Sequence, residues 1–321
     1  MRWDPSEEAV WVAARRLMGG FSVEVTPRES GKLDAVARAL EPGTAVYVTH
    51  LAAVGFDRVL ETVRQVRERG LRPVVHLAVR AIPDMDALDR TLGALVDEGV
   101  ADLLLIAGSM RPSGGIENTL QVLESAALRR RAFTGIGVAG HPEGNPGVDP
   151  GTVDHALARK NEIAAELGLP LHVVTQFGFS PDPILRWERR MRDEGIDLPV
   201  HVGLPGLTTP AKLIRFGLSC GVGPSLAVLR KQSRGVLTLA TQEYRPADTV
   251  AGLARAVAAD PDSLISAVHF FPFGAVLPTA AWATAISEGR FAVAEDGGLV
   301  TDVDRGRPAR EVRSRRSGSA G

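Results

Sequence analysis

Short apolar runs alternate with longer amphipathic stretches along most of the chain. The apolar runs are rich in valine, leucine and isoleucine, whereas alanine, leucine, arginine and glutamate dominate the stretches between them. Strand-like runs that alternate with helical patterns are typical of a parallel sheet built from βαβ units. Eight runs are predicted as strands, at 21–27, 44–50, 72–79, 102–108, 133–140, 171–179, 198–206 and 264–273.

Eight strands that alternate with helices favour an α/β fold of the closed (β/α)₈ TIM-barrel type over an open doubly wound sheet. The stretch between the seventh and eighth strands is long and contains several helical patterns, so we expect extra helices there. Residues 1–20 are predicted to form an N-terminal helix, residues 21–300 a single barrel domain, and residues 301–321 a disordered basic tail.

Composition narrows the classes of protein that fit this pattern. The chain has 321 residues and a net charge of −1, which gives no reason to expect a nucleic-acid partner. Its one cysteine, Cys220, fits a reducing compartment. No apolar run approaches the roughly 18 residues of a membrane span, and the charged N-terminus does not resemble a signal peptide. We therefore expect a soluble cytoplasmic protein without a membrane partner, and the sequence leaves the question of a homo-oligomer open.

Active sites of barrels lie at the C-terminal ends of the strands, so polar residues at those positions are the first candidates for chemistry. Neutral hydrogen-bonding groups predominate there, and only two of the groups are carboxylates. The candidates are Glu24, Thr49, His50, His76, Ser109, His141, Glu143, Asn145, Thr175, Gln176 and His269. His155, His172 and His201 are interpreted as packing or surface residues.

Several reaction classes are disfavoured by what the sequence lacks. It contains no H-E-x-x-H zinc motif, no phosphate-binding G-x-x-x-x-G-K-[ST] loop, no G-x-G-x-x-G opening a helix and no G-x-S-x-G elbow. A glycosidase would use two carboxylates such as Glu24 and Glu143, but sugar sites usually add several aromatic residues, which make up only 5% of this chain.

Glu24 is unusual because it places a charge inside a strand-like run, FSVEVTP. A buried carboxylate is costly unless it is paired or used in catalysis. One interpretation is a structural carboxylate that is paired with an arginine at the barrel mouth such as Arg28. The other is an acid group in an active site.

An ordered set of short motifs favours the second interpretation. The motifs are SVEVTPR (22–28), HLA (76–78), IAGS (106–109), VAGHPEGNP (138–146), VVTQFGFSPD (173–182), PVHVGLPGL (199–207) and AVHFFPF (267–273). In their order and spacing they resemble the strand-end motifs of the methylenetetrahydrofolate reductase family, over about residues 20–290. Each motif alone is weak, whereas the ordered set is fairly specific.

The resemblance implies an oxidoreductase that transfers hydride from NAD(P)H, through FAD, to the methylene group of 5,10-methylenetetrahydrofolate. Glu24 matches the general acid of the family, and a raised pKa would suit that role. The resemblance assigns Gln176, Ser109 and Phe271 to the folate substrate. It assigns Thr49, His50, His76, Gly108, Ser109, His141, Glu143 and Asn145 to the cofactor side, and Arg159 and Lys160 to the pyrophosphate of FAD.

Several departures from the family pattern keep alternatives open. Where the family has Arg-Gly-Asp after its fourth strand, this chain has Ala107, Gly108 and Ser109. His141 and Asn145 also replace family residues. A flavin-independent reductase, a folate-dependent methyl or one-carbon transferase, and a non-catalytic folate- or flavin-binding partner subunit therefore remain alternatives. The choice between NADH and NADPH is not readable from the sequence.

Overall fold

The eight predicted strands form a closed parallel barrel in sequence order. The computed structural model describes residues 6–50, 54–108, 110–145, 148–209, 213, 246–294 and 297–303. Neighbouring strands pair in parallel all the way round, and β8 pairs with β1 to close the barrel. The strands are β1 (Ser22–Val25), β2 (Ala45–Thr49), β3 (Arg72–Ala78), β4 (Asp102–Ile106), β5 (Gly135–Gly140), β6 (Leu171–Thr175), β7 (Val200–Pro205) and β8 (Ile265–Phe271). The predicted (β/α)₈ barrel is confirmed.

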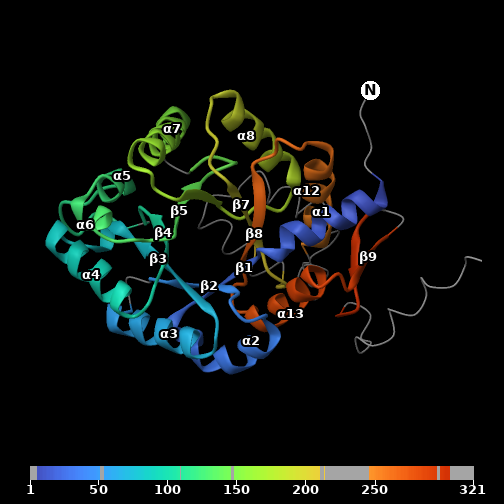
Figure 1. The fold of residues 1–321 in the computed structure, drawn as a ribbon, viewed down its shortest axis with the longest axis horizontal. Coiled ribbons are helices and arrows are strands. Elements are labelled where there is room, and N and C mark those ends of the chain that lie inside the picture. The colour runs from blue at the N-terminus through green and yellow to red at the C-terminus, as the bar shows by residue number, and fades with distance from the viewer. Residues whose placement is uncertain are drawn as a thin grey trace, which may run out of the picture.

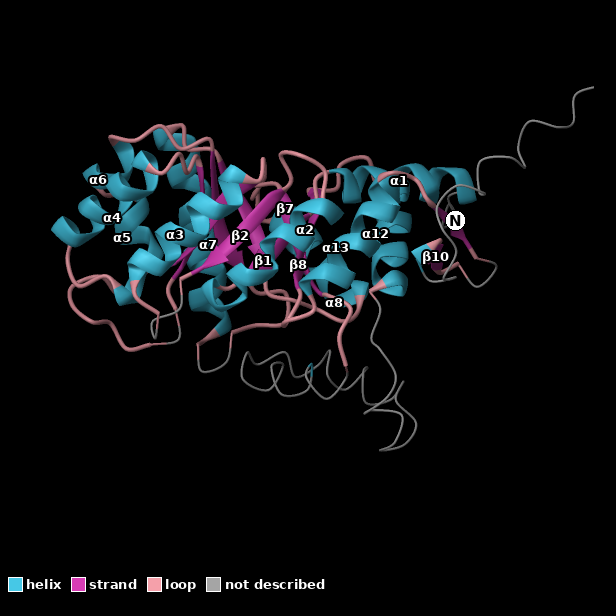
Figure 2. Ribbon diagram, turned by 90° about the horizontal axis from the view of Figure 1, so that it is seen from below, coloured by secondary structure: helices cyan, strands magenta, loops and turns pink. Residues whose placement is uncertain are grey.

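Helices surround the strands on the outside (Figures 1 and 2). They are α1 (Glu7–Gly19), α2 (Leu33–Ala39), α3 (Phe56–Glu68), α4 (Met85–Asp97), α5 (Thr119–Leu123), α6 (Ala126–Arg129), α7 (Pro150–Leu167), α8 (Pro181–Asp193), α12 (Ala247–Ala259) and α13 (Val276–Ser287). Two short 3₁₀ helices, Pro27–Lys32 and Val79–Ala81, follow β1 and β3.

Local sequence explains where these helices begin and end. Asp84 caps α4 by accepting a hydrogen bond from the backbone N–H of Ala87 at 2.7 Å. Asp149 caps α7 in the same way, and Pro150 occupies the first turn, where its missing N–H costs nothing. Gly168 ends α7 in the left-handed conformation that favours glycine.

The two faces of the barrel strands differ sharply in chemistry. Side chains that point outward, such as Val23, Val75 and Leu103, belong to one large apolar cluster that also contains the inner faces of the helices. Side chains that point into the barrel belong to a much smaller apolar cluster with Tyr47 and Leu104. The rest of the lumen is polar, with Ser22, Glu24, His76, His172, His201 and His269.

Other predictions about the fold have mixed outcomes. The N-terminal helix is confirmed as α1, and α12 is one of the extra helices expected between β7 and β8. Residues 210–212 and 214–245 of that segment, which include Cys220, and residues 304–321 of the tail lie outside the described residues. A two-stranded antiparallel hairpin of β9 (Phe291–Val293) and β10 (Leu299–Thr301) was not predicted. In the described part of the chain, no helix is long and apolar enough to span a membrane.

Candidate active site

Glu24 and His76 form a hydrogen-bonded pair at the C-terminal side of the lumen. The distance between Glu24 Oε2 and His76 Nδ1 is 2.9 Å. Strand register brings them together, because Glu24 lies beside Tyr47 on β2, and Thr49, two residues further on, lies beside His76 on β3. Their side chains are 17% and 12% exposed, respectively, so solvent or a ligand can reach the pair. The partner of Glu24 is therefore His76, and not Arg28 as the sequence had suggested.

The acidity of Glu24 differs from what the resemblance implied. Burial raises the pKa of its carboxyl, but the hydrogen bond and the charge of His76 oppose this effect, with further lowering by His269 and Thr49. The balance places the pKa of Glu24 below its ordinary value, so the expectation of a raised pKa is wrong for the free protein. Glu24 is ionised near neutral pH in the absence of a ligand.

Thr49 and His50 extend this polar side of the mouth. The Thr49 hydroxyl donates to the carbonyl oxygen of Val25 at 3.4 Å, and the backbone N–H of His50 donates to the carbonyl oxygen of His76 at 2.9 Å. Burial, followed by the charge of His76, lowers the pKa of His50. Its Nδ1 atom is buried and has no hydrogen-bond partner among the described residues.

Phenylalanine rings form an apolar wall on the other side, where β6 and β8 end. The ring of Phe177 lies 5.8 Å from Phe271 and 5.1 Å from Phe273, and Phe179 lies 5.8 Å from Phe177. Phe273 has a φ of 48°, a conformation that is strained for a residue with a bulky side chain. Gln176 lies beside this wall, and its Oε1 accepts a hydrogen bond from the backbone N–H of Phe177 at 3.1 Å.

The loop after β5 brings His141, Glu143 and Asn145 together in a tight turn, which is closed by a 3.0 Å hydrogen bond from Gly144 N–H to the carbonyl of His141. Lys160, on the inner face of α7, is electrostatically coupled to His141. Burial, and then the charge of Lys160, lowers the pKa of His141 to about 4, and burial lowers the pKa of Lys160 to about 8. His141 is therefore neutral at physiological pH.

Arg159 does not join this group. Its guanidinium binds three carboxylates on the outer helical surface, those of Glu124, Glu162 and Glu166, each at 3.0 Å. A guanidinium occupied in this way is poorly placed to bind a pyrophosphate, so the structure does not support that role for Arg159. The neighbouring Lys160 lies on the buried face of α7 instead, because successive helical residues differ by about 100° in direction.

Gly108 lies just after β4 with a φ of 88°, and a Cβ at this position would come within 3.2 Å of Ala78 Cβ. The Arg80 guanidinium donates to its carbonyl oxygen at 3.3 Å. Ser109, predicted for both the cofactor and the substrate, lies outside the described residues.

The sequence singled out His76 and His269 as candidates, but it did not predict that His172 and His201 point into the same lumen. His172 and His201 stack with ring centroids 4.3 Å apart, and His269, which is fully buried, bonds through Nδ1 to the Ser22 hydroxyl oxygen at 2.8 Å. The sequence contains a signal for this arrangement, because residues two apart on a strand point to the same side of the sheet. His155, in contrast, is exposed on α7, as expected. No group of three or more metal-ligating side chains occurs in the described parts of the chain.

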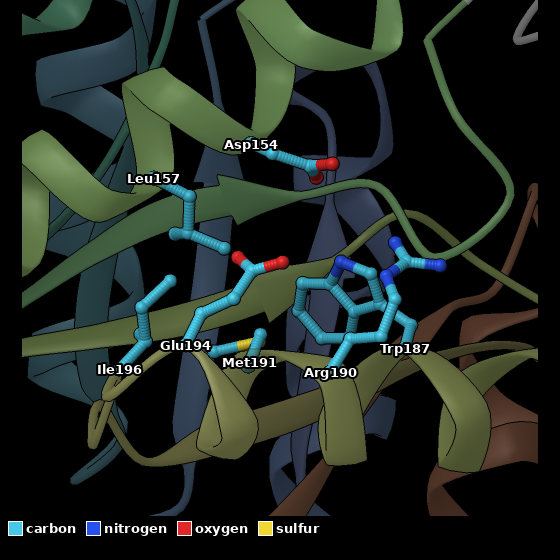
Figure 3. A pocket seen from close by; sticks show the side chains of 7 residues that line it. All are labelled: Asp154, Leu157, Trp187, Arg190, Met191, Glu194 and Ile196. Carbon is cyan, nitrogen blue, oxygen red and sulfur yellow. The ribbon is translucent and has the colours of Figure 1, made fainter.

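Two hollows on the helical surface lie away from the strand ends. One, between α7 and α8, has a volume of about 10 Å³, which is room for no more than about one water molecule (Figure 3). The other, of about 360 Å³, is lined by the first turns of α4 and by α6, and its Asp89 carboxylate is already paired with Arg130 and Arg131. Neither offers the chemistry found at the barrel mouth.

Fold and site together define a (β/α)₈ barrel with a histidine-rich lumen and a mouth that is polar on one side and aromatic on the other. No family model matches the chain. Similar solved structures include a dihydropteroate synthase from Burkholderia cenocepacia (16% identity, TM-score 0.43, covering 83% of this chain and 91% of that chain). They also include tryptophan synthase from M. tuberculosis (13%, 0.42, 89% and 93%) and a putative dihydrodipicolinate synthetase from Pseudomonas aeruginosa (10%, 0.44, 84% and 77%). Similarity this low says nothing about the activity of this chain.

Proposed function

We propose that this protein is an oxidoreductase that transfers hydride from NAD(P)H to the methylene group of 5,10-methylenetetrahydrofolate, giving 5-methyltetrahydrofolate. The observation that carries the proposal is the Glu24–His76 pair, with its 2.9 Å hydrogen bond at the mouth of the barrel. It supports the proposal because the carboxyl group of Glu24, once protonated, could supply the proton that this reaction requires, and it lies where the resemblance places the acid. The aromatic wall opposite offers flat surfaces against which a planar ring can pack.

The reaction consumes one proton as well as one hydride. Protonation of a ring nitrogen opens the imidazolidine ring to an iminium ion, and hydride addition to the iminium carbon then gives the methyl group. Glu24 can pass a proton onward, because one carboxyl oxygen accepts from His76 Nδ1 while the other, when protonated, donates its O–H to the substrate. A bound substrate removes water from Glu24, which raises the pKa of its carboxyl and favours the protonated form.

The resemblance also implies FAD, which would carry the hydride between nicotinamide and folate. The residues expected to hold its pyrophosphate do not fit that task well, since Arg159 is bound by three glutamates and Lys160 is buried beside His141. This arrangement favours the flavin-independent alternative, in which the nicotinamide donates hydride directly to the substrate. NAD(P)H is the hydride donor in both versions.

The first test replaces the proposed acid. Glu24→Gln keeps the shape of the side chain but cannot deliver the proton, and general acids contribute about 10²–10⁴ in rate. We therefore expect NAD(P)H-dependent reduction of methylenetetrahydrofolate to fall by at least about 100-fold. Glu166→Gln, on the outer face of α7, is the matched control and should retain full activity. Full activity in Glu24→Gln would show that Glu24 is not the acid.

The second test concerns the route of the hydride. An absorption spectrum of the purified protein, with identification of any molecule released by heating, shows whether a flavin is bound. A colourless protein that oxidises NAD(P)H with methylenetetrahydrofolate supports direct transfer. A yellow protein whose activity is lost with its flavin supports the FAD-dependent version.

A further inference from the structure

A column of histidines runs through the barrel from its lower end to Glu24. At the lower end, His172 and His201 are each partly exposed and stack at 4.3 Å. In the middle, His269 is 0% exposed, and its ring lies 4.3 Å from the ring of Tyr47. At the upper end, Glu24 and His76 face the mouth.

Each part of the column is coupled to the next. Strand register places His269 beside Ser22 of β1, two residues before Glu24. It also places His269 beside Gly203 of β7, two residues after His201. The Ser22 hydroxyl forms a 2.8 Å hydrogen bond with His269 Nδ1, and the Tyr47 ring packs against the His269 ring. His269 is thus the link between the two ends of the column.

Three imidazole nitrogens along the column are buried without a partner among the described residues, namely Nε2 of His76, of His172 and of His269. Buried polar atoms are nearly always hydrogen-bonded in native proteins, and ordered water commonly supplies the missing partner. Most barrels fill this space with branched aliphatic side chains instead. Unpaired nitrogens at successive levels of the lumen are therefore the positions at which bound water would connect neighbouring imidazole groups.

We infer that His172, His201 and His269 form a proton pathway. It delivers a proton to the Glu24–His76 pair from the lower end of the barrel while substrate covers the mouth. The inference rests on the proposed function, in which each turnover consumes one proton. Glu24 is ionised in the free protein, so its proton must arrive after the substrate has bound. At that stage the mouth is blocked, and the lumen is the remaining route.

The imidazole groups of the pathway can be neutral before and after each proton transfer. A neutral imidazole has one N–H and one lone pair, so it accepts a proton at one nitrogen and releases one from the other. A proton taken from water at the His172–His201 stack passes through His201 to His269. From His269 a proton passes, through water, to His76 Nε2, and His76 releases the proton on Nδ1 to Glu24 Oε2. Glu24 then gives one proton to the substrate nitrogen. One proton enters and one leaves in each turnover.

Proton uptake on ligand binding tests this pathway without turnover. The probe is 5-methyltetrahydrofolate, mixed with the protein in a weakly buffered solution that contains a pH indicator. In the wild type, binding should be followed by rapid uptake of a proton. In His201→Gln and His269→Gln we expect uptake at least tenfold slower, with the rate of ligand binding, followed by tryptophan fluorescence, unchanged.

Controls separate the pathway from general effects on packing. Val174→Ala alters the same lumen without removing an imidazole and should leave uptake fast, and added free imidazole should restore uptake in His201→Gln. If His269→Gln does not fold, the partly exposed His172 and His201 variants decide the question. Unchanged uptake in both, or wild-type binding without uptake, overturns the pathway. Absence of binding in the wild type overturns the proposed function instead.

Discussion

Glu24 shows how a single hydrogen bond decides the state of a buried carboxyl group. Desolvation alone would raise the pKa of its carboxyl, but His76 at 2.9 Å, together with His269 and Thr49, outweighs that effect. Removal of one member of a buried pair leaves the other uncompensated, so each residue depends on its partner. The pair is therefore a structural unit in which neither side chain can be removed without leaving the other unpaired.

Lys160 differs from Glu24, because it is a buried charged group without a counter-charge among the described residues. It is 8% exposed, and among the described residues its ammonium group forms no hydrogen bond or ion pair. Burial lowers its pKa to about 8. We expect Lys160→Met to increase the free energy of unfolding at pH 7 by about 2 kcal/mol, because it removes the cost of desolvating the ammonium.

Urea unfolding at pH 7 measures this effect. Arg159→Met, its neighbour on the exposed face of α7, is the matched control and should change stability by less than about 1 kcal/mol in either direction. A loss of stability in Lys160→Met would mean that a counter-charge compensates the ammonium in the folded protein.

At the residue scale, the sequence predicted the importance of Glu24 but not its partner. A charge inside an apolar run is visible in one dimension, whereas its contact with His76 depends on the register of three strands. The salt bridges of Arg159 on α7 could also be predicted from the sequence. Glu162 and Glu166 lie three and seven residues further along, and this spacing places all three on the same face of a helix.

Among the elements, β7 shows why small residues are needed where strand ends approach aromatic groups. Gly203 lies beside His269 of β8, and the Phe271 ring covers it. A Cβ at this position would come within 2.9 Å of Phe271 Cε2 and would clash with the carbonyl oxygen of Thr175. The glycine thus lets the aromatic wall and the lumen meet.

Substitution of this glycine tests the packing. Gly203→Ala should destabilise the protein by about 2–3 kcal/mol, because the added methyl group forces the backbone of β6 or the Phe271 ring to move. Gly31→Ala is the matched control, since nothing lies within 4 Å of its Cβ position. Thermal and urea unfolding measure both, and equal stability of the two variants would contradict the prediction.

The strands could be predicted because each is a short apolar run between helical patterns. The β9–β10 hairpin was missed because its strands have only three residues each, although Gly297 between them, with a φ of 80°, is a turn signal. It was harder to predict which residues of each strand face the lumen and which face the helices. Lumen and outer face alternate along every strand, and the apolar outer face hid the polar lumen.

At the scale of the whole molecule, the buried histidines make stability depend on pH. Burial is the main cause that lowers the pKa to about 3 for His172 and His269 and to about 4 for His201. These groups stay neutral in the folded protein, whereas the unfolded chain binds protons below about pH 6.5. The unfolded state therefore gains protons as the pH falls, and stability must fall with it.

We expect the free energy of unfolding to decrease steadily from pH 6.5 to 4.5, by up to about 1.4 kcal/mol per pH unit for His269 and by less for the two partly exposed histidines. Urea titrations at several pH values measure the slope, and His201→Gln should reduce it. A flat profile over this range would contradict the burial of neutral histidines. The window lies above the range in which most carboxylates titrate.

The division between an apolar shell and a polar lumen has a consequence for how this protein can change. Folding energy resides mainly between strands and helices, in the cluster that contains Val23, Val75 and Leu103. Lumen positions can therefore acquire new side chains with a smaller penalty than in a barrel that is filled with aliphatic residues. A library of variants confined to the lumen should retain the fold in a large share of its members, which makes this barrel a suitable scaffold for evolving new chemistry.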